Sequence, residues 1–163
     1  MRFLQIRSVI VTVIVMLSFV AAPAALAENL YTAYNIWYEQ PDHLYAINYK
    51  KGAMIPAGTE VKDVRGRHKT ITFTTVKDGQ VYKVEFEKDF HPGLTAADYV
   101  KKMFTTQNFA DLTKGMDQKE VEAIRQGILV MGMSKAAVIV AYGYPPEHVT
   151  SSQDLNKWTY WMD

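Results

Sequence analysis

The side chains that most often carry out chemistry are spread along this chain without the spacing of a catalytic or metal site. The four histidines, His43, His68, His91 and His148, stand alone, and no H-x-x-x-H pair places two imidazoles on one helix face. The chain has no cysteine, which excludes thiolate metal ligands and disulfides. The sequence therefore predicts neither a metal nor a cofactor.

The serine and the carboxylates that could serve in catalysis stand instead where helix-capping residues are expected. Ser134 lacks the G-x-S-x-G turn that presents a nucleophilic serine. Thr95 with Asp98, and Asp117 with Glu120, have the spacing of a capping box at the start of a helix. Because no nucleophile has a general base in a recognisable pattern, we predict that the protein is not an enzyme and has no catalytic residues.

These caps place three helices in the second half of the chain. The first begins after Thr95, the second lies between Asp117 and Gly127, and the third covers residues 135–142 and ends at Gly143. In the second helix, the side chains expected to face the core are Val121, Ile124 and Ile128.

Two glycines should differ in importance. Gly143 ends a helix, where the backbone needs a positive φ that a β-branched residue resists. Gly66 stands between Arg65 and Arg67, in a stretch that we interpret as a charged loop. We therefore expect Gly143→Val to damage folding more than Gly66→Val.

The first half of the chain, from Leu30 to about Phe90, has the period-two alternation of β-strands. Asp78-Gly79 stands between two alternating runs, which predicts a hairpin with one apolar and one polar face. The stretch from Ile55 to Val61 resembles the opening of a small SH3-like barrel. Strands are expected at residues 31–38, 43–49, 59–64, 69–76 and 80–87.

Together these elements predict an α+β fold in two parts. Residues 28–93 form a small antiparallel β unit, and residues 94–163 form a helical unit in which a helix pair packs on a short sheet. The alternation over residues 156–162 predicts the strand of that sheet. A single strand is not stable alone, so either it pairs with the β unit or the natural protein continues past Asp163, and we favour the second.

The segment from Ile128 to Trp161 carries an ordered series of motifs. A Gly-Met-Ser helix start, a valine four residues later, a Gly-x-Pro helix stop and a W-x-Y strand follow one another. The residues are Gly132, Met133, Ser134, Val138, Gly143, Pro145, Trp158 and Tyr160. In this order the segment resembles the SmpA/OmlA family, component E of the outer-membrane β-barrel assembly machine, and the same plan occurs in β-lactamase inhibitor proteins. These residues would build the helix pair, with Trp158 and Tyr160 in the core.

The resemblance implies a non-catalytic role in envelope or outer-membrane assembly, through contact with a partner protein. That family is typically anchored by a lipid-modified cysteine, so this chain would associate with the outer membrane peripherally, without a lipid anchor. An alternative stays open, in which the aromatic residues from Tyr31 to Tyr49 bind the cell wall or a small ligand, or the protein acts as an inhibitor. An exposed aromatic row would favour ligand binding, and a row packed under the helices would favour assembly.

Residues 1–27 have the order of a cleavable secretory signal peptide. Arg2 and Arg7 precede an apolar run over residues 9–20, and a small-x-small pattern ends at Ala27. The apolar run is shorter than the roughly 20 residues of a membrane-spanning helix. We therefore predict a periplasmic or envelope location.

The charge of the chain narrows the choice of partner. The formal net charge is +1, and acidic and basic residues are interspersed. A nucleic-acid-binding protein normally has a basic face, so we predict no nucleic-acid partner.

The signal peptide gives a first testable prediction. We expect signal peptidase to cut after Ala27, so that N-terminal sequencing of the protein from an envelope fraction starts at Glu28. A protein that starts at Met1, or that is found only in the cytosol, would contradict export.

Overall fold

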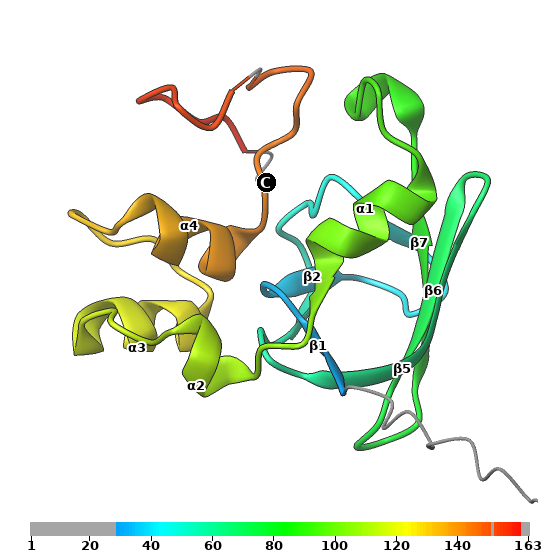
Figure 1. The fold of residues 1–163 in the computed structure, drawn as a ribbon, viewed down its shortest axis with the longest axis horizontal. Helices are drawn as coiled ribbons and strands as arrows, with labels where there is room; N and C mark the ends of the chain where they lie inside the picture. Colours follow the sequence, from blue (N-terminus) through cyan, green and yellow to red (C-terminus); the bar gives the residue numbers. More distant parts are fainter. Residues whose placement is uncertain (1–28, 151, 161–163) are drawn as a thin grey trace, which may run out of the picture.

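The alternating runs of the first half form a curled sheet in the computed structural model, which describes residues 29–150 and 152–160 (Figure 1). The strand order is β3-β7-β6-β5-β1-β8, and neighbouring strands are antiparallel except for β3 and β7. The last short strand, β8, pairs with the first, β1. The fold is α+β, as the sequence predicts. The bounds are β1 Leu30–Thr32, β3 Leu44–Tyr45, β5 Glu60–Arg67, β6 Thr70–Thr75, β7 Val81–Glu85 and β8 Phe104–Thr105.

The predicted hairpin around Asp78-Gly79 is confirmed as β6 and β7. Phe73 pairs with Tyr82 across the two strands, and their rings stack with centroids 5.1 Å apart. The side chains of both residues are buried, whereas Val81 on the opposite face of β7 is 57% exposed. The alternation of apolar and polar residues in the sequence therefore corresponds to one buried and one solvated face of the hairpin.

The predicted strand over residues 31–38 is broken in two. β1 stays in the main sheet, and β2 (Ile36–Tyr38) pairs with β4 (Ala53–Ile55) in a separate two-stranded sheet. The break falls where Asn35 turns its side chain inward to the helices. The run over residues 43–49 is likewise shortened to β3, because Asn48 takes a positive φ of 51° and leaves the strand.

The position of Gly66 differs from the prediction that it lies in a charged loop. The residue lies inside β5 rather than in a loop, and faces the first turn of α1 (Ala96–Met103). A Cβ atom at Gly66 would come within 2.7 Å of the Ala96 carbonyl oxygen. Substitution of Gly66 should therefore disrupt helix packing, although its φ is not positive. Gly143 does need its glycine, since φ is 80° and a Cβ would lie 2.9 Å from the Tyr34 ring.

The predicted helix caps are present. Thr95 and Asp98 form a complete capping box on α1, and Asp117 and Glu120 form another on α3 (Gln118–Gln126). α3 ends at Gly127, whose φ of 63° is left-handed, so Ile128 lies beyond the helix and is 38% exposed instead of buried. The remaining helical elements are η1 Lys88–Phe90, α2 Phe109–Leu112 and α4 Lys135–Tyr142.

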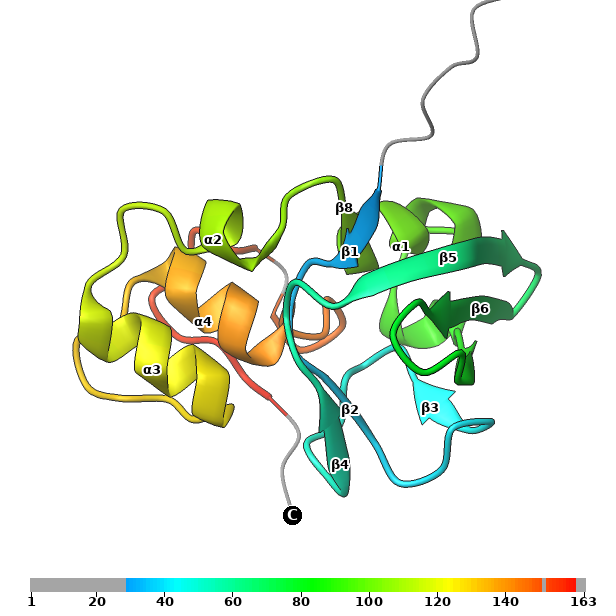
Figure 2. The ribbon, with the colours of Figure 1, turned by 90° about the horizontal axis from the view of Figure 1, so that it is seen from below.

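The helices divide between two cores. α1 packs on β5 and β6, and β8 pairs with β1, so both complete the core of the main sheet. α2, α3 and α4 lie to one side, with β2 and β4 between them and the main sheet (Figure 2). The smaller core includes Ile124, Val140 and Ala141, and the loop residue Ala57. The proposed division at residues 93 and 94 stays a prediction.

The helix pair does not pack on a terminal strand, which corrects the prediction for residues 156–162. Residues 156–160 form no strand, and residues 161–163 lie outside the described part of the chain. The Thr159 N–H donates to the Thr150 hydroxyl instead of to a neighbouring strand. Residues 145–150 and 152–160 have an irregular backbone. The end of α3 at Gly127 instead lies against Trp37 of β2 and Met54 of β4.

Two buried asparagines join the N-terminal segment to the helix ends. The Asn35 amide nitrogen donates to the carbonyl oxygens of Ile124, at 2.7 Å, and Ala141, at 3.1 Å. The Asn48 amide nitrogen donates to the carbonyl oxygen of Tyr142, at 2.7 Å. The last carbonyl groups of a helix lack partners within it, so the bonds to Ala141 and Tyr142 satisfy the buried end of α4. The bond to Ile124 adds a second donor to a carbonyl oxygen of α3 that the Gly127 N–H already reaches.

The asparagine contacts give a testable prediction. Asn35→Asp keeps the size of the side chain but replaces the amide donor with oxygens that face two carbonyl groups. We expect a loss of about 2–4 kcal/mol in the free energy of unfolding, measured by urea denaturation. The matched control is Asn156→Asp at an exposed position, which should change stability by less than about 0.5 kcal/mol. Equal effects of the two substitutions would contradict the capping role.

Candidate functional site

The residues of the family-like motif build helix ends rather than a chemical site. The Ser134 hydroxyl accepts a hydrogen bond from the Ala137 N–H, at 3.2 Å, and so caps α4. The Ser134 N–H donates to a Glu120 carboxylate oxygen, at 2.6 Å, and this bond lowers the pKa of Glu120 below its ordinary value. Glu120 therefore connects the start of α3 to the start of α4. This contact gives the Glu120 carboxylate a structural role.

The remaining motif residues also have structural positions. Gly132 has a φ of 84° in the loop before α4, and the Met133 sulfur accepts a hydrogen bond from the Val130 N–H, at 3.4 Å. Val138 is half-buried on α4, and Pro145 is buried after the helix stop. None of these side chains offers a nucleophile, an acid or a charged binding group.

Trp158 and Tyr160 do not share one buried strand face. Tyr160 packs against the helix core, and its hydroxyl donates to the Gly143 carbonyl oxygen at 3.0 Å. Trp158 is only half-buried, and its indole N–H donates to the Gln153 carbonyl oxygen, while the Lys135 ammonium lies 5.5 Å from the ring centroid. The prediction that Trp158 belongs to the core is wrong, because the chain there is a surface loop.

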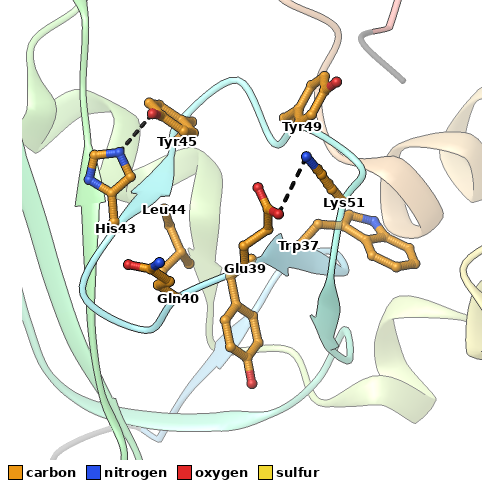
Figure 3. Close-up of a pocket in the computed structure, with 9 residues that line it drawn as sticks. Trp37, Glu39, Gln40, His43, Leu44, Tyr45, Tyr49 and Lys51 are labelled. Atoms are coloured by element: carbon orange, nitrogen blue, oxygen red, sulfur yellow. Dashed lines mark hydrogen bonds and ion pairs between the residues drawn. The ribbon is translucent and has the colours of Figure 1, made fainter. Parts of the chain in front are cut away.

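The aromatic residues between Tyr31 and Tyr49 separate into buried and open groups. Tyr34 is 1% exposed and lies beneath Gly143 and Tyr144. Trp37, Tyr45 and Tyr49 instead line a pocket of about 190 Å³ at the surface (Figure 3). The row is therefore neither wholly packed under the helices nor a continuous exposed platform. The pocket is lined by Trp37, Tyr38, Glu39, Gln40, His43, Leu44, Tyr45, Tyr49 and Lys51.

Polar groups stand among the pocket rings. The Glu39 carboxylate and the Lys51 ammonium form an ion pair at 3.4 Å, drawn below Tyr49 and beside Trp37 in Figure 3. His43 lies at the rim, with Nε2 2.7 Å from the Tyr45 hydroxyl and Nδ1 3.3 Å from a Glu85 carboxylate oxygen. The site thus offers apolar ring faces together with both hydrogen-bond donors and acceptors, a combination suited to binding.

The helix ends hold one wall of the pocket in place. The Trp37 N–H donates to the Asn48 side-chain oxygen at 3.0 Å, and the Trp37 ring packs so closely on Gly127 that a Cβ there would clash. The Lys50 ammonium lies over the rings of both Trp37, at 5.2 Å, and Tyr142, at 4.7 Å. The Trp37 indole therefore packs on the end of α3, and the Lys50 ammonium links it to Tyr142 of α4 by contacts between a cation and aromatic faces.

The histidines do not assemble into a metal site, although His148 lies near His91. Within residues 29–150 and 152–160, no group of three or more His, Asp or Glu side chains is placed to hold a metal ion. In the same part of the chain, no helix combines the length and apolar character that crossing a membrane requires.

Comparisons with known proteins identify no relative. No protein-family model, no curated protein and no solved structure matches the chain. The resemblance of residues 128–161 to the SmpA/OmlA family stays a prediction from the motifs alone.

The sequence pointed to the pocket only through the density of aromatic residues in 31–49. It did not distinguish Tyr34, which is buried, from Tyr45, which is 46% exposed. Glu39, His43 and Lys51 were not selected by their sequence pattern, because the β2–β4 pairing and the loop through β3 bring them together.

The burial of these rings gives a third prediction. Tyr34→Ala should lower the free energy of unfolding by about 3–5 kcal/mol, because it removes a fully buried aromatic ring. Trp158→Ala should cost only about 1 kcal/mol, since that ring is half in solvent. Chemical denaturation of both variants measures the difference. A larger loss for Trp158→Ala than for Tyr34→Ala would restore a core role for Trp158.

Proposed function

We propose that this chain is a non-catalytic exported protein that acts in the cell envelope by contact with a partner protein. The observation that carries the proposal is the open aromatic pocket of Trp37, Tyr45 and Tyr49, held against the helix ends. Protein interfaces concentrate their binding energy in aromatic anchors and the pockets that receive them. We assign the partner contact to this pocket.

The size and composition of the pocket support contact with a protein segment. Its volume of about 190 Å³ is below the roughly 300 Å³ at which pockets for whole small-molecule ligands begin. A pocket of this size suits one inserted side chain, with the rest of the segment lying across the rim. The exposed ring of Tyr45 and the charged pair of Glu39 and Lys51 are available at that rim.

The envelope location rests on the sequence. Residues 1–27 have the order of a signal peptide, and the motifs from Gly132 to Tyr160 resemble an outer-membrane assembly family. We propose a peripheral association with the outer membrane, since this sequence has no cysteine that could carry a lipid. The near-neutral charge supports a protein partner rather than nucleic acid.

A specific observation favours binding of cell-wall glycan as a second candidate function. Glu39 supplies acceptors and Lys51 supplies donors between aromatic rings, and Gln40 adds an amide at the same pocket. Sugar rings present apolar faces and hydroxyl groups at once, so one glycan unit would use both kinds of contact. Binding to purified cell wall and capture of a protein partner separate the two functions.

Site-specific cross-linking in cells tests the proposal. A photoreactive amino acid at Gln40, on the pocket rim, should capture a protein partner, whereas the same group at Val81 on β7 should not. Tyr45→Ala should reduce the cross-link at position 40 by about tenfold or more, because a lost hot-spot residue costs about 1.4 kcal/mol or more. Val81→Ala is the matched control at another exposed apolar position.

Three outcomes decide between the candidates. Capture that requires Tyr45 supports the protein contact. Equal capture from positions 40 and 81, or capture that Tyr45→Ala leaves unchanged, contradicts it. Sedimentation of the protein with purified cell wall, lost in Tyr45→Ala and with no protein cross-link at position 40, would instead support glycan binding.

A further inference from the structure

A buried histidine outside the pocket lacks hydrogen-bond partners. His91 follows η1 and is 3% exposed, with its ring stacked on Phe86, at 5.2 Å between centroids, and beside Tyr99, at 4.3 Å. Neither ring nitrogen has a hydrogen-bond partner among the described residues. Buried polar groups are nearly always paired, so an imidazole left unpaired on both nitrogens requires an explanation.

The charged groups around His91 come from three elements. Lys102 of α1 pairs with Glu147 of the C-terminal segment, and His148 follows on that segment. Tyr99 of α1 touches the ring, and Glu85 and Glu87 line the same small cavity of about 10 Å³ as His91. Burial is the main cause that lowers the pKa of His91, to about 4, while Glu147 acts against this shift and Lys102 adds to it.

We propose that His91 is an acid-sensitive latch: its protonation opens the junction between the η1–α1 region and residues 145–150 of the C-terminal segment. The inference is independent of the pocket and of its partner. It concerns which surface the molecule presents at a given pH.

The geometry explains why a proton would open this junction. An imidazolium has two N–H donors. The space between the Phe86 and Tyr99 rings, where the His91 ring lies, holds no acceptor for either of them. The nearby Glu147 carboxylate is already paired with Lys102, whose positive charge repels a second cation. The protonated ring must therefore draw Glu147 away from Lys102 or move out to water.

Near the latch the segment is held by side-chain contacts, while Tyr160 anchors its far end to the helix core through the Gly143 carbonyl oxygen. Residues 145–150 and 152–160, the parts of the segment that the structure describes, contain no helix or strand. Their contacts near the latch are the Lys102–Glu147 ion pair and the contact of Phe90 with His148, whose ring centroids lie 4.9 Å apart. Movement of His91 disturbs both, because Phe90 is its neighbour in sequence and Lys102 lies on the helix that packs against its ring.

The direction of the pH effect follows from the lowered pKa. An opened His91 regains a pKa near 6.5, so the open form binds a proton more tightly than the closed form, whose pKa is about 4. The closed form is therefore fully favoured above pH 6.5 and loses its advantage as the pH falls towards 4. Between pH 7 and pH 5, the opening equilibrium should rise by about 20-fold.

Backbone hydrogen exchange, measured on the protein purified from cells without further truncation, tests the latch. The protection factors of residues 147–150, whose Val149 and Thr150 amides donate to the Pro146 carbonyl oxygen, should fall by about 20-fold between pH 7 and pH 5, while those of β6 and β7 should stay unchanged. His91→Phe, which fits between the same rings without a titrating group, should abolish the pH dependence. His68→Asn, which removes an exposed histidine in the β5–β6 turn, should retain it.

A second variant and a direct titration keep the inference open to refutation. If His91→Phe fails to fold, His91→Gln should fold and show the same loss of pH dependence, because the amide does not titrate in this range. An NMR titration of the His91 ring should show no protonation above about pH 5 in the closed form. A pH response that survives in both variants, or a wild-type segment whose protection does not change with pH, would overturn the latch.

Discussion

The structure depends on a small set of hydrogen bonds that Asn35 and Asn48, in the N-terminal half of the chain, donate to the end of α4. The carbonyl oxygens of Val140, Ala141 and Tyr142 would be left without partners where the helix stops. They accept hydrogen bonds from the Asn35 backbone, the Asn35 side chain and the Asn48 side chain, respectively. Because these groups are buried, each unpaired carbonyl would cost about 1–3 kcal/mol, so this part of the chain and the helix fold together or not at all.

The same bonds determine where the aromatic pocket forms. Asn48 leaves the strand conformation to reach α4, and its side-chain oxygen receives the Trp37 N–H. Lys50 then extends over Trp37 and Tyr142, and Lys51 reaches Glu39 across the pocket. The position of the pocket is thus a consequence of how the end of α4 is capped.

The sequence predicted those features whose determinants lie within a few residues. Asp78-Gly79 makes its hairpin, and Ser134 and Gly143 begin and end α4, because each signal acts on its own turn of backbone. The broken strand at Asn35 was not predictable in this way, since its partners Ile124 and Ala141 are far away in sequence. The alternation over residues 156–162 failed for the same reason: a strand needs a neighbour, and residues 156–160 have none.

The central claim is that the two asparagine amides are buried caps that hold the pocket and the helices together. NMR hydrogen exchange of the Asn35 and Asn48 side-chain NH₂ groups tests it most directly. We predict that both groups exchange as slowly as the most protected backbone amides of β6, through global unfolding alone. Rapid exchange of either group in a protein whose β6 amides stay protected would show that the helix ends open independently, and would contradict the account.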